Sequence, residues 1–359
     1  MRHRFHSICP YFAMFPEAFA EKHLRVIPED AVVLDPFSGR GTTVFQSLLS
    51  GRVGLGIDVN PVAVCVSRAK ANPPTISEIR ERIEAIEESF EPLIDPVQED
   101  PFFQACFEAT TLHQILWLRN SLNWREDKVD CFIAAMAAGC LHGESHRSAR
   151  VFSNRMPRTI STKPAYSVRW WSDRGYTPPK RDVFEILRQE ADFRYASDPA
   201  TVVGVVKEGD ARAGADLLPE WRGKVGAVIT SPPYLDVTHF REDQWLRVWF
   251  LGGASKPCSA KEGDDRHWEE GSYWRFLEES WKGIAPLMRS DARLTVRIGG
   301  NRLTAEAAKE GLDRTLSSAF GHVVCKEVVT SEIQRGQLRA FRPNAAGIRR
   351  EFDLVFQIA

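Results

Sequence analysis

Two short segments carry residues whose types and spacing suit binding and chemistry. In the first, Asp35-Pro-Phe-Ser-Gly-Arg-Gly-Thr-Thr43, Gly39 and Gly41 allow a tight turn and let the backbone approach a ligand closely. Asp58 stands 19 residues after Gly39, at the end of the next apolar run, where a carboxylate can accept both hydroxyls of a ribose. Two glycines alone indicate only a turn, and Val44 replaces the third glycine of a dinucleotide fingerprint. The acid and the residues flanking the glycines therefore make this a candidate nucleotide-binding turn.

The second segment is Ser231-Pro-Pro-Tyr234, which follows the apolar run 225–229. Its plain interpretation is a strand ended by prolines, because proline cannot donate to a sheet ladder. In its chemical interpretation, the Ser231 hydroxyl oxygen and the Pro232 carbonyl accept the two protons of a ring-bound amine. They thereby direct the nitrogen lone pair, which is catalysis by orientation and electrostatics. Tyr234 offers a flat face on which a planar ring can stack, and no histidine-and-acid motif indicates a nucleophilic Ser231.

The elements that must position these residues are strands and helices of an α/β fold. The apolar runs 31–34 and 53–57 each lead into an aspartate, as parallel strands do when their carboxyl ends carry a site. Residues 42–50 have helical spacing between them. We therefore predict a doubly wound, mostly parallel Rossmann-like sheet, with a polar loop at 252–271 as a candidate lid. Further strands are expected at 201–206, 225–229, 294–298, 322–324 and 352–356.

Residues 71–199 are predicted to form a helical insertion. A capping box of Thr75 and Glu78 precedes one apolar stripe at helical spacing. The stripe consists of Ile76, Ile79, Ile83, Ile86 and Phe90.

The later part of this insertion, residues 147–181, is basic and interleaved with aromatic side chains. Cations neutralise phosphates, and aromatic or guanidinium planes stack on bases; the alternative is a solvated basic face over a local core. The candidate contacts to nucleic acid are Arg155, Arg158, Lys163 and Arg169.

Taken together, the two segments resemble the S-adenosylmethionine-binding and catalytic motifs of the DNA amino-methyltransferases. The resemblance implies S-adenosylmethionine as cofactor, with Asp58 on its ribose. It also places Asp210 and Ala211 near the adenine ring, and the segment 12–17, including Phe15 and Pro16, over the methionine end. The remaining cofactor residues that it implies are Asp35, Pro36, Phe37, Gly39, Gly41 and Thr42.

The function implied by the resemblance is methyl transfer to a DNA base that is flipped out of the duplex. The catalytic residues would be Ser231, Pro232, Pro233 and Tyr234, and serine at the first position is usual in the cytosine-N4 group. Residues 1–70 and 200–359 would form the catalytic domain and 71–199 the target-recognition region. Double-stranded DNA is the implied partner, with a cognate restriction endonuclease in a restriction-modification system. The alternatives are an adenine-N6 enzyme, an RNA base methyltransferase or a non-catalytic nucleic-acid-binding protein.

Composition limits the remaining possibilities. The 359 residues carry a net charge of −1, so nucleic-acid binding must follow from where charge lies. Seven cysteines occur without a Cys-x-x-Cys pair, and we expect no metal site. No apolar run reaches the roughly 18 residues that span a bilayer. A cytoplasmic protein without membrane association is expected.

Overall fold

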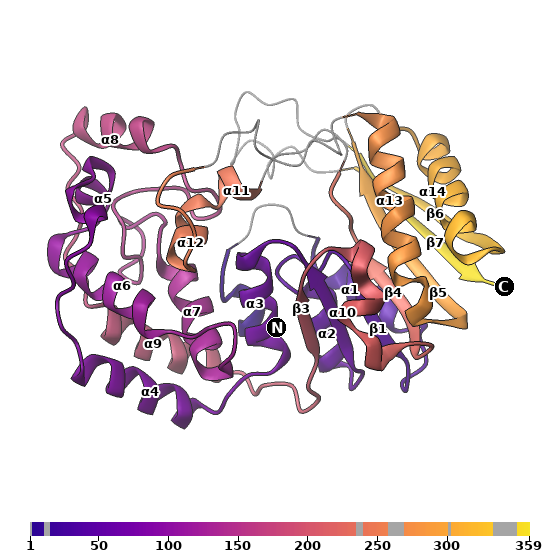
Figure 1. The fold of residues 1–359 in the computed structure, drawn as a ribbon, viewed down its shortest axis with the longest axis horizontal. Helices are drawn as coiled ribbons and strands as arrows, with labels where there is room; N and C mark the ends of the chain where they lie inside the picture. The colour runs from indigo at the N-terminus through magenta and orange to yellow at the C-terminus, as the bar shows by residue number, and fades with distance from the viewer. Residues whose placement is uncertain (1, 11–14, 235–239, 258–268, 301–302, 333–349) are drawn as a thin grey trace. The chain divides into compact units, whose positions relative to one another are not determined.

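The computed structural model describes residues 2–10, 15–234, 240–257, 269–300, 303–332 and 350–359 (Figure 1). The chain forms two compact units, each assembled from separate stretches of sequence. The helical unit comprises Met1–Met14, Asn60–Pro199 and His239–Gly263. The sheet unit comprises Phe15–Val59, Ala200–Thr238 and Asp264–Ala359.

The sheet unit is built on a sheet that has seven strands within the described residues, in the order β3-β2-β1-β4-β5-β7-β6. The strands β3, β2, β1, β4 and β5 run parallel to their neighbours, whereas β7 is antiparallel to both β5 and β6. The predicted mostly parallel sheet is therefore confirmed. The bounds are β1 (Val32–Asp35), β2 (Gly54–Asp58), β3 (Val205–Glu208), β4 (Val225–Thr230), β5 (Met288–Gly299), β6 (Val323–Glu332) and β7 (Arg350–Ile358).

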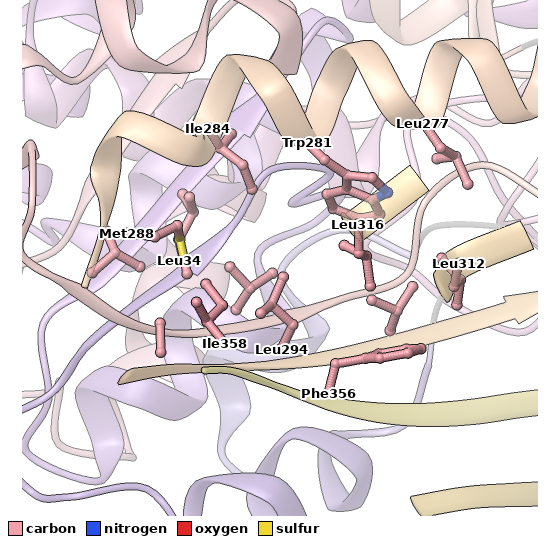
Figure 2. Packing of buried hydrophobic residues seen from close by; sticks show 14 of the residues in the cluster. Leu34, Leu277, Trp281, Ile284, Met288, Leu294, Leu312, Leu316, Phe356 and Ile358 are labelled. Atoms are coloured by element: carbon pink, nitrogen blue, oxygen red, sulfur yellow. The ribbon is translucent and has the colours of Figure 1, made fainter. Parts of the chain in front are cut away.

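Helices cover both faces of this sheet, as a doubly wound fold requires. On one face Leu34 of β1 packs in a cluster with α13 (Glu270–Ile284) and α14 (Ala305–Phe320). In Figure 2 the side chains of Leu277 and Trp281 extend from α13 toward the strands. Val33, the next residue of β1, packs on the other face with α1 (Glu17–Leu24). This alternation along a strand is expected when both faces are buried. Shorter helices of the unit are α10 (Gly214–Leu217), η3 (Ala211–Ala213), η4 (Pro219–Trp221) and η7 (Ala285–Leu287).

Two glycines of β2 set how closely α2 (Thr42–Leu49) approaches the sheet. A Cβ atom at Gly54 would lie 2.5 Å from the carbonyl oxygen of Val44, and one at Gly56 would lie 3.0 Å from the Ser38 Cβ. Larger residues would therefore push the helix away from the strand. The glycines hold the turn before α2 against the carboxyl ends of β1 and β2.

The helical unit includes the predicted insertion. The capping box of Thr75 and Glu78 begins α4, and Ile79, Ile83 and Ile86 of the predicted stripe are buried. The helices of the unit are η1 (Arg4–Ser7), α3 (Pro61–Ala71), α4 (Ile76–Glu88), η2 (Pro96–Glu99), α5 (Pro101–Cys106), α6 (Ala109–Ser121), α7 (Lys128–Cys140), α8 (Pro164–Ser172), α9 (Val183–Tyr195), α11 (Phe240–Asp243) and α12 (Trp245–Phe250).

A buried arginine on α12 joins the three stretches of the helical unit. Arg247 is fully buried and donates to the carbonyl oxygens of Pro10 at 2.7 Å, Ala138 at 2.9 Å and Arg158 at 2.7 Å. A fourth bond of 2.7 Å goes to the side chain of Gln244. Each acceptor offsets part of the cost of burying the charge, so the arginine acts as an internal cross-link.

Some strand limits differ from those predicted. The strand expected at 201–206 begins only at Val205, where it pairs with Leu55, and it continues to Glu208 opposite Asp58. Pairing with β2 thus decides its position, and Val203 before it is exposed. The strand expected at 322–324 continues to Glu332, because its long partner β7 offers a ladder over that whole length.

Candidate functional site

The two predicted segments follow strands that are neighbours in the sheet. Asp35 ends β1, Asp58 ends β2, and Ser231 comes directly after β4. Because β2, β1 and β4 are parallel neighbours, their carboxyl ends lie at the same edge. From β1 the chain continues to β2 and β3 on one side of β1, whereas β4 and β5 lie on its other side. The strand order therefore reverses between β1 and β4, which is the switch point of the sheet. Open α/β sheets bind their ligands at this position.

A direct hydrogen bond links the two segments. The Thr230 hydroxyl donates to Asp35 Oδ1 at 2.6 Å, and the Phe37 N–H donates to the same oxygen at 3.2 Å. Asp35 is fully buried, and its Oδ2 has no hydrogen-bond partner among the described residues. Burial raises the pKa of the Asp35 carboxyl to about 7, although the bonds from Thr230 and Phe37 oppose this shift. The unpartnered oxygen is suited to a positively charged ligand group.

The glycine turn orients the second carboxylate. Gly39 and Gly41 have φ values of 49° and 69°, a left-handed conformation that residues with a Cβ rarely adopt. The Gly39 N–H donates to Asp58 Oδ2 at 2.8 Å. Gly41 immediately precedes α2, and Thr42 and Thr43 of the helix's first turn are buried. The turn therefore fixes the Asp58 carboxylate at Gly39, shortly before the N-terminus of α2.

The N-terminal segment predicted to close over a ligand is described only in part. Residues 12–14 lie outside the described residues, and the structure places Phe15 and Pro16 just before α1. The Phe15 ring packs edge-on against Phe19, with ring centroids 5.0 Å apart, whereas Pro16 is exposed. The next residue, Glu17, forms an ion pair of 3.2 Å with the buried Arg40 of the glycine turn. This ion pair, which the sequence did not indicate, holds α1 to the turn.

The other residues predicted at the cofactor lie in different environments. Pro36 is buried, and the Phe37 ring packs toward α13, 5.7 Å from the Phe276 ring centroid. Asp210 follows β3 and forms an ion pair of 2.7 Å with Arg212, while Ala211 is buried. The Asp210 carboxylate is therefore already partnered within its own motif.

The tyrosine of the second segment is held by residues distant in sequence. Pro232 is buried, Pro233 is exposed, and Tyr234 is half-buried. The Tyr234 hydroxyl donates to Glu351 Oε1 at 2.8 Å. Burial and the neighbouring Glu351 carboxylate hold the pKa of the Tyr234 hydroxyl well above its usual value. Glu351 on β7 lies 117 residues away, so neither spacing nor motif could have indicated it.

The four predicted nucleic-acid contacts differ in how available their charges are. Arg155 is half-buried, and its guanidinium lies 4.0 Å from the Tyr176 ring centroid. Lys163 is exposed but forms an ion pair of 2.7 Å with Glu242. Arg158 and Arg169 are exposed, and within the described part of the chain neither forms a salt bridge. The latter two cations are thus the most available for phosphate.

The aromatic side chains of this segment also divide into two groups. Phe152 and Trp171 are buried, and the Trp171 indole donates to a backbone carbonyl at 2.6 Å. Trp170 is half-buried, and the centroids of its ring and of the Tyr176 ring are 5.4 Å apart. The Arg174 guanidinium lies 4.7 Å from the centroid of the Trp170 ring. Guanidinium and aromatic planes arranged in this way form surfaces on which bases can stack.

Other features of the described residues bear on cofactors and membranes. They contain no group of three or more His, Cys, Asp or Glu side chains arranged to hold a metal ion. Both ring nitrogens of the buried His142 are engaged, by the Pro157 carbonyl at 2.9 Å and the Ser161 hydroxyl at 3.1 Å. No helix among the described residues is both long enough and apolar enough to cross a membrane. Of the predicted lid at 252–271, residues 258–268 lie outside the described residues, and its last two residues begin α13.

Two comparisons with known proteins match only part of the chain. Residues 3–68 match the family model described as DNA methylase. The type II methyltransferase M.MvaI of Kocuria varians is 35% identical over 92 residues, which cover 25% of this chain and 20% of that protein. The match thus spans about a fifth of the relative's length. The predicted resemblance to the DNA amino-methyltransferases is confirmed, without a distinction between the cytosine-N4 and adenine-N6 groups.

Two solved structures are similar at lower identity. The rRNA methyltransferase aviRa of Streptomyces viridochromogenes is 13% identical, with 98% of this chain and 88% of that chain covered and a TM-score of 0.35. TrmN of Thermus thermophilus is 11% identical, with 99% and 52% covered and a TM-score of 0.36. Similarity at this level does not indicate a function.

Proposed function

We propose that this protein transfers the methyl group of S-adenosylmethionine to N4 of cytosine in a specific sequence of double-stranded DNA. The observation that carries the proposal is the 2.6 Å hydrogen bond from Thr230 to Asp35 at the β4 and β1 switch point. It joins the end of the strand before Ser231 to the start of the glycine turn. A segment suited to orienting an amine therefore lies next to a turn suited to a nucleotide cofactor.

The residues of the turn fit S-adenosylmethionine. Asp58, whose Oδ2 accepts the Gly39 N–H, would accept the ribose hydroxyls. The buried Asp35 Oδ2 without a partner suits the cationic methionine end. At the adenine end, Asp210 would have to share its carboxylate with Arg212. When bound, the cofactor supplies an electrophilic methyl group on a positively charged sulfur.

The chain's own contribution to the reaction is to position the amine. An exocyclic amine is a poor nucleophile because its lone pair is delocalised into the ring. The Ser231 hydroxyl oxygen and the Pro232 carbonyl would accept its two protons and direct the lone pair at the methyl group. Pro233 restricts the backbone between these acceptors and Tyr234, whose ring would stack on a flipped base.

The choice of cytosine rests on Ser231, because serine at this position is usual in the cytosine-N4 group. An adenine-N6 enzyme, an RNA base methyltransferase and a non-catalytic nucleic-acid-binding protein are the alternatives. For DNA contact we propose Arg158 and Arg169 as phosphate contacts, with Arg155 stacked beside the aromatic surface and Lys163 released from its ion pair. The matched relative is a type II methyltransferase, so we propose a restriction-modification system with a cognate endonuclease.

The test is to incubate the purified chain with methyl-labelled S-adenosylmethionine and either plasmid DNA of mixed sequence or total RNA. The nucleosides are then identified by mass spectrometry, with Ser231→Ala as the matched control. We expect N4-methylcytosine in DNA from the parent only. N6-methyladenine would overturn the choice of base, and label in RNA alone would overturn the choice of nucleic acid. Nucleic-acid binding without any label would support the non-catalytic alternative.

A further inference from the structure

The tyrosine of the Ser231–Tyr234 segment is anchored at its hydroxyl end. Its oxygen donates to Glu351 Oε1 at 2.8 Å, so the ring is fixed at both the backbone and the hydroxyl. We propose that Glu351 is a positioning residue, which holds Tyr234 and through it the Ser231–Tyr234 segment in the geometry that accepts the target amine. This inference rests on the proposed function and adds a residue that neither the motifs nor the comparisons assign.

Glu351 is itself held in place by a buried arginine. Its Oε2 lies 3.5 Å from Nη1 of Arg297 on β5. Arg297 in turn donates two bonds to Asp353, of 2.6 and 2.8 Å, and both side chains are less than a tenth exposed. A bidentate guanidinium–carboxylate pair has a fixed planar geometry. Glu351 can therefore present its other oxygen to Tyr234 in one orientation.

The backbone next to the ring leaves space for Tyr234 in this position. A Cβ atom at Gly299, the last residue of β5, would lie 3.0 Å from Tyr234 Cε2 and 3.1 Å from its Cδ2. That separation is tighter than ordinary van der Waals contact, so a side chain there would displace the ring. The glycine and the carboxylate thus act on the same side chain, near Cδ2 and Cε2 of the ring and at its hydroxyl end.

The arginine also reaches the segment predicted to close over the cofactor. The Arg297 guanidinium carbon lies 4.1 Å from the centroid of the Phe19 ring. Phe19 packs edge-on against Phe15, with centroids 5.0 Å apart. Cation–aromatic and aromatic–aromatic contacts of this kind are each favourable. A continuous series of contacts therefore leads from Phe15 through Phe19 and Arg297 to Glu351 and Tyr234.

The experiment compares Glu351→Ala, which removes the acceptor, with Glu351→Gln, which keeps an oxygen acceptor for the tyrosine. Glu332→Gln on the neighbouring strand β6 is the matched control, because Glu332 is exposed and faces Arg350 across the ladder. Each protein is assayed for single-turnover methylation of DNA, S-adenosylmethionine affinity, thermal melting and amide hydrogen exchange in the peptide 225–234.

We expect Glu351→Ala to lower the single-turnover rate by about 10- to 100-fold, the effect of losing one charge-assisted hydrogen bond. Cofactor affinity should stay within about twofold, and exchange in the peptide 225–234 should rise at least severalfold, since its anchor is gone. Glu351→Gln should recover most of the rate, and Glu332→Gln should match the parent. The double variant Tyr234→Phe with Glu351→Ala should have a single-turnover rate only slightly below that of the slower single variant, because both substitutions remove the same hydrogen bond.

A parental rate and unchanged exchange in folded Glu351→Ala would overturn the inference. A loss of rate that only parallels a lower melting temperature and is not rescued by glutamine would overturn it as well, since that pattern indicates general destabilisation. If the parent methylates neither DNA nor RNA, the proposed function fails. The hydrogen-exchange comparison would then still decide whether Glu351 positions the segment.

Discussion

The buried carboxyl of Asp35 should make the stability of the protein fall as the pH rises. Burial raises its pKa from 3.8 to about 7, so the folded state holds this proton more tightly than the unfolded state does. A group of this kind favours folding at acidic pH, and the advantage is lost as the pH rises above the unfolded pKa. Asp35→Asn keeps the volume and the acceptor for Thr230 but removes the titration.

The expected size follows from the two pKa values. Full ionisation of the folded state costs about 4 kcal/mol relative to the unfolded state, at about 1.4 kcal/mol per pH unit. Roughly 2 kcal/mol of this cost is already present at pH 5, because the unfolded carboxyl is ionised there. Between pH 5 and pH 8 the free energy of unfolding of the parent should therefore fall by roughly 2 to 3 kcal/mol relative to Asp35→Asn. Comparing the two proteins cancels the other titrating groups.

Urea unfolding of both proteins at pH 5, 6.5 and 8 measures this difference. Parallel pH curves would refute the argument from burial. A cationic cofactor should also bind the parent more tightly as the pH rises toward 7, since binding favours the ionised Asp35. Calorimetry in two buffers of different ionisation enthalpy should then detect proton release for the parent but not for Asp35→Asn.

Three further predictions concern binding and rate. Ser231→Ala should lower the single-turnover methylation rate by about 10²–10³, because one preorganised acceptor is lost, and its melting temperature should be unchanged. A folded variant that methylates at the parental rate would contradict the mechanism. Asp58→Ala should weaken S-adenosylmethionine binding in calorimetry by about 1–3 kcal/mol, because the ribose hydroxyls lose their acceptor; equal affinity would remove Asp58 from the cofactor site. Arg158→Ala with Arg169→Ala should reduce the salt slope of DNA binding in fluorescence anisotropy by about 0.9 per lost phosphate contact. Lys163→Ala should change the salt slope less, because the ion pair with Glu242 already offsets the lysine charge. An unchanged slope for the double arginine variant would assign both arginines to a solvated surface.

The strands and the glycine turn could be predicted because their signals are local. The runs that lead into Asp35 and Asp58 are short, apolar and followed by polar residues, and β1 and β2 end at these two aspartates. Gly39 and Gly41 occupy left-handed positions, which the spacing of two glycines before a helix suggests. Each of these features depends on a few consecutive residues.

The anchoring of Tyr234 could not be predicted, because it depends on pairing between distant strands. The direction and position of β7, between β5 and β6, follow from tertiary pairing, and its apolar pattern is compatible with either direction. Within the apolar run 352–356, the charged Asp353 indicated a buried partner. That partner, Arg297, and the link through Glu351 appear once β5 and β7 are aligned.

The basic segment shows a different limit of sequence analysis. Composition indicates that residues 147–181 are rich in cations and aromatic rings, but it does not say which of them face solvent. Trp170 and Trp171 are neighbours, yet the first lies against Arg174 and Tyr176 and the second is buried with its indole N–H bonded to a carbonyl. Glu242, which pairs with Lys163, is distant in sequence and gives no local signal.

The cross-link made by Arg247 has a consequence for the biosynthesis of the chain. Its carbonyl acceptors lie at residues 10, 138 and 158, so they emerge from the ribosome long before the donor is translated. If these carbonyls were buried before then, they would lack this donor, which is costly in an apolar interior. The sheet unit is interleaved in the same way, with β1 and β7 near opposite ends of the described chain. The helical unit therefore cannot finish folding until Arg247 has been translated, and the sheet unit cannot finish until β7 has been translated. A truncation before Arg247 would damage both units.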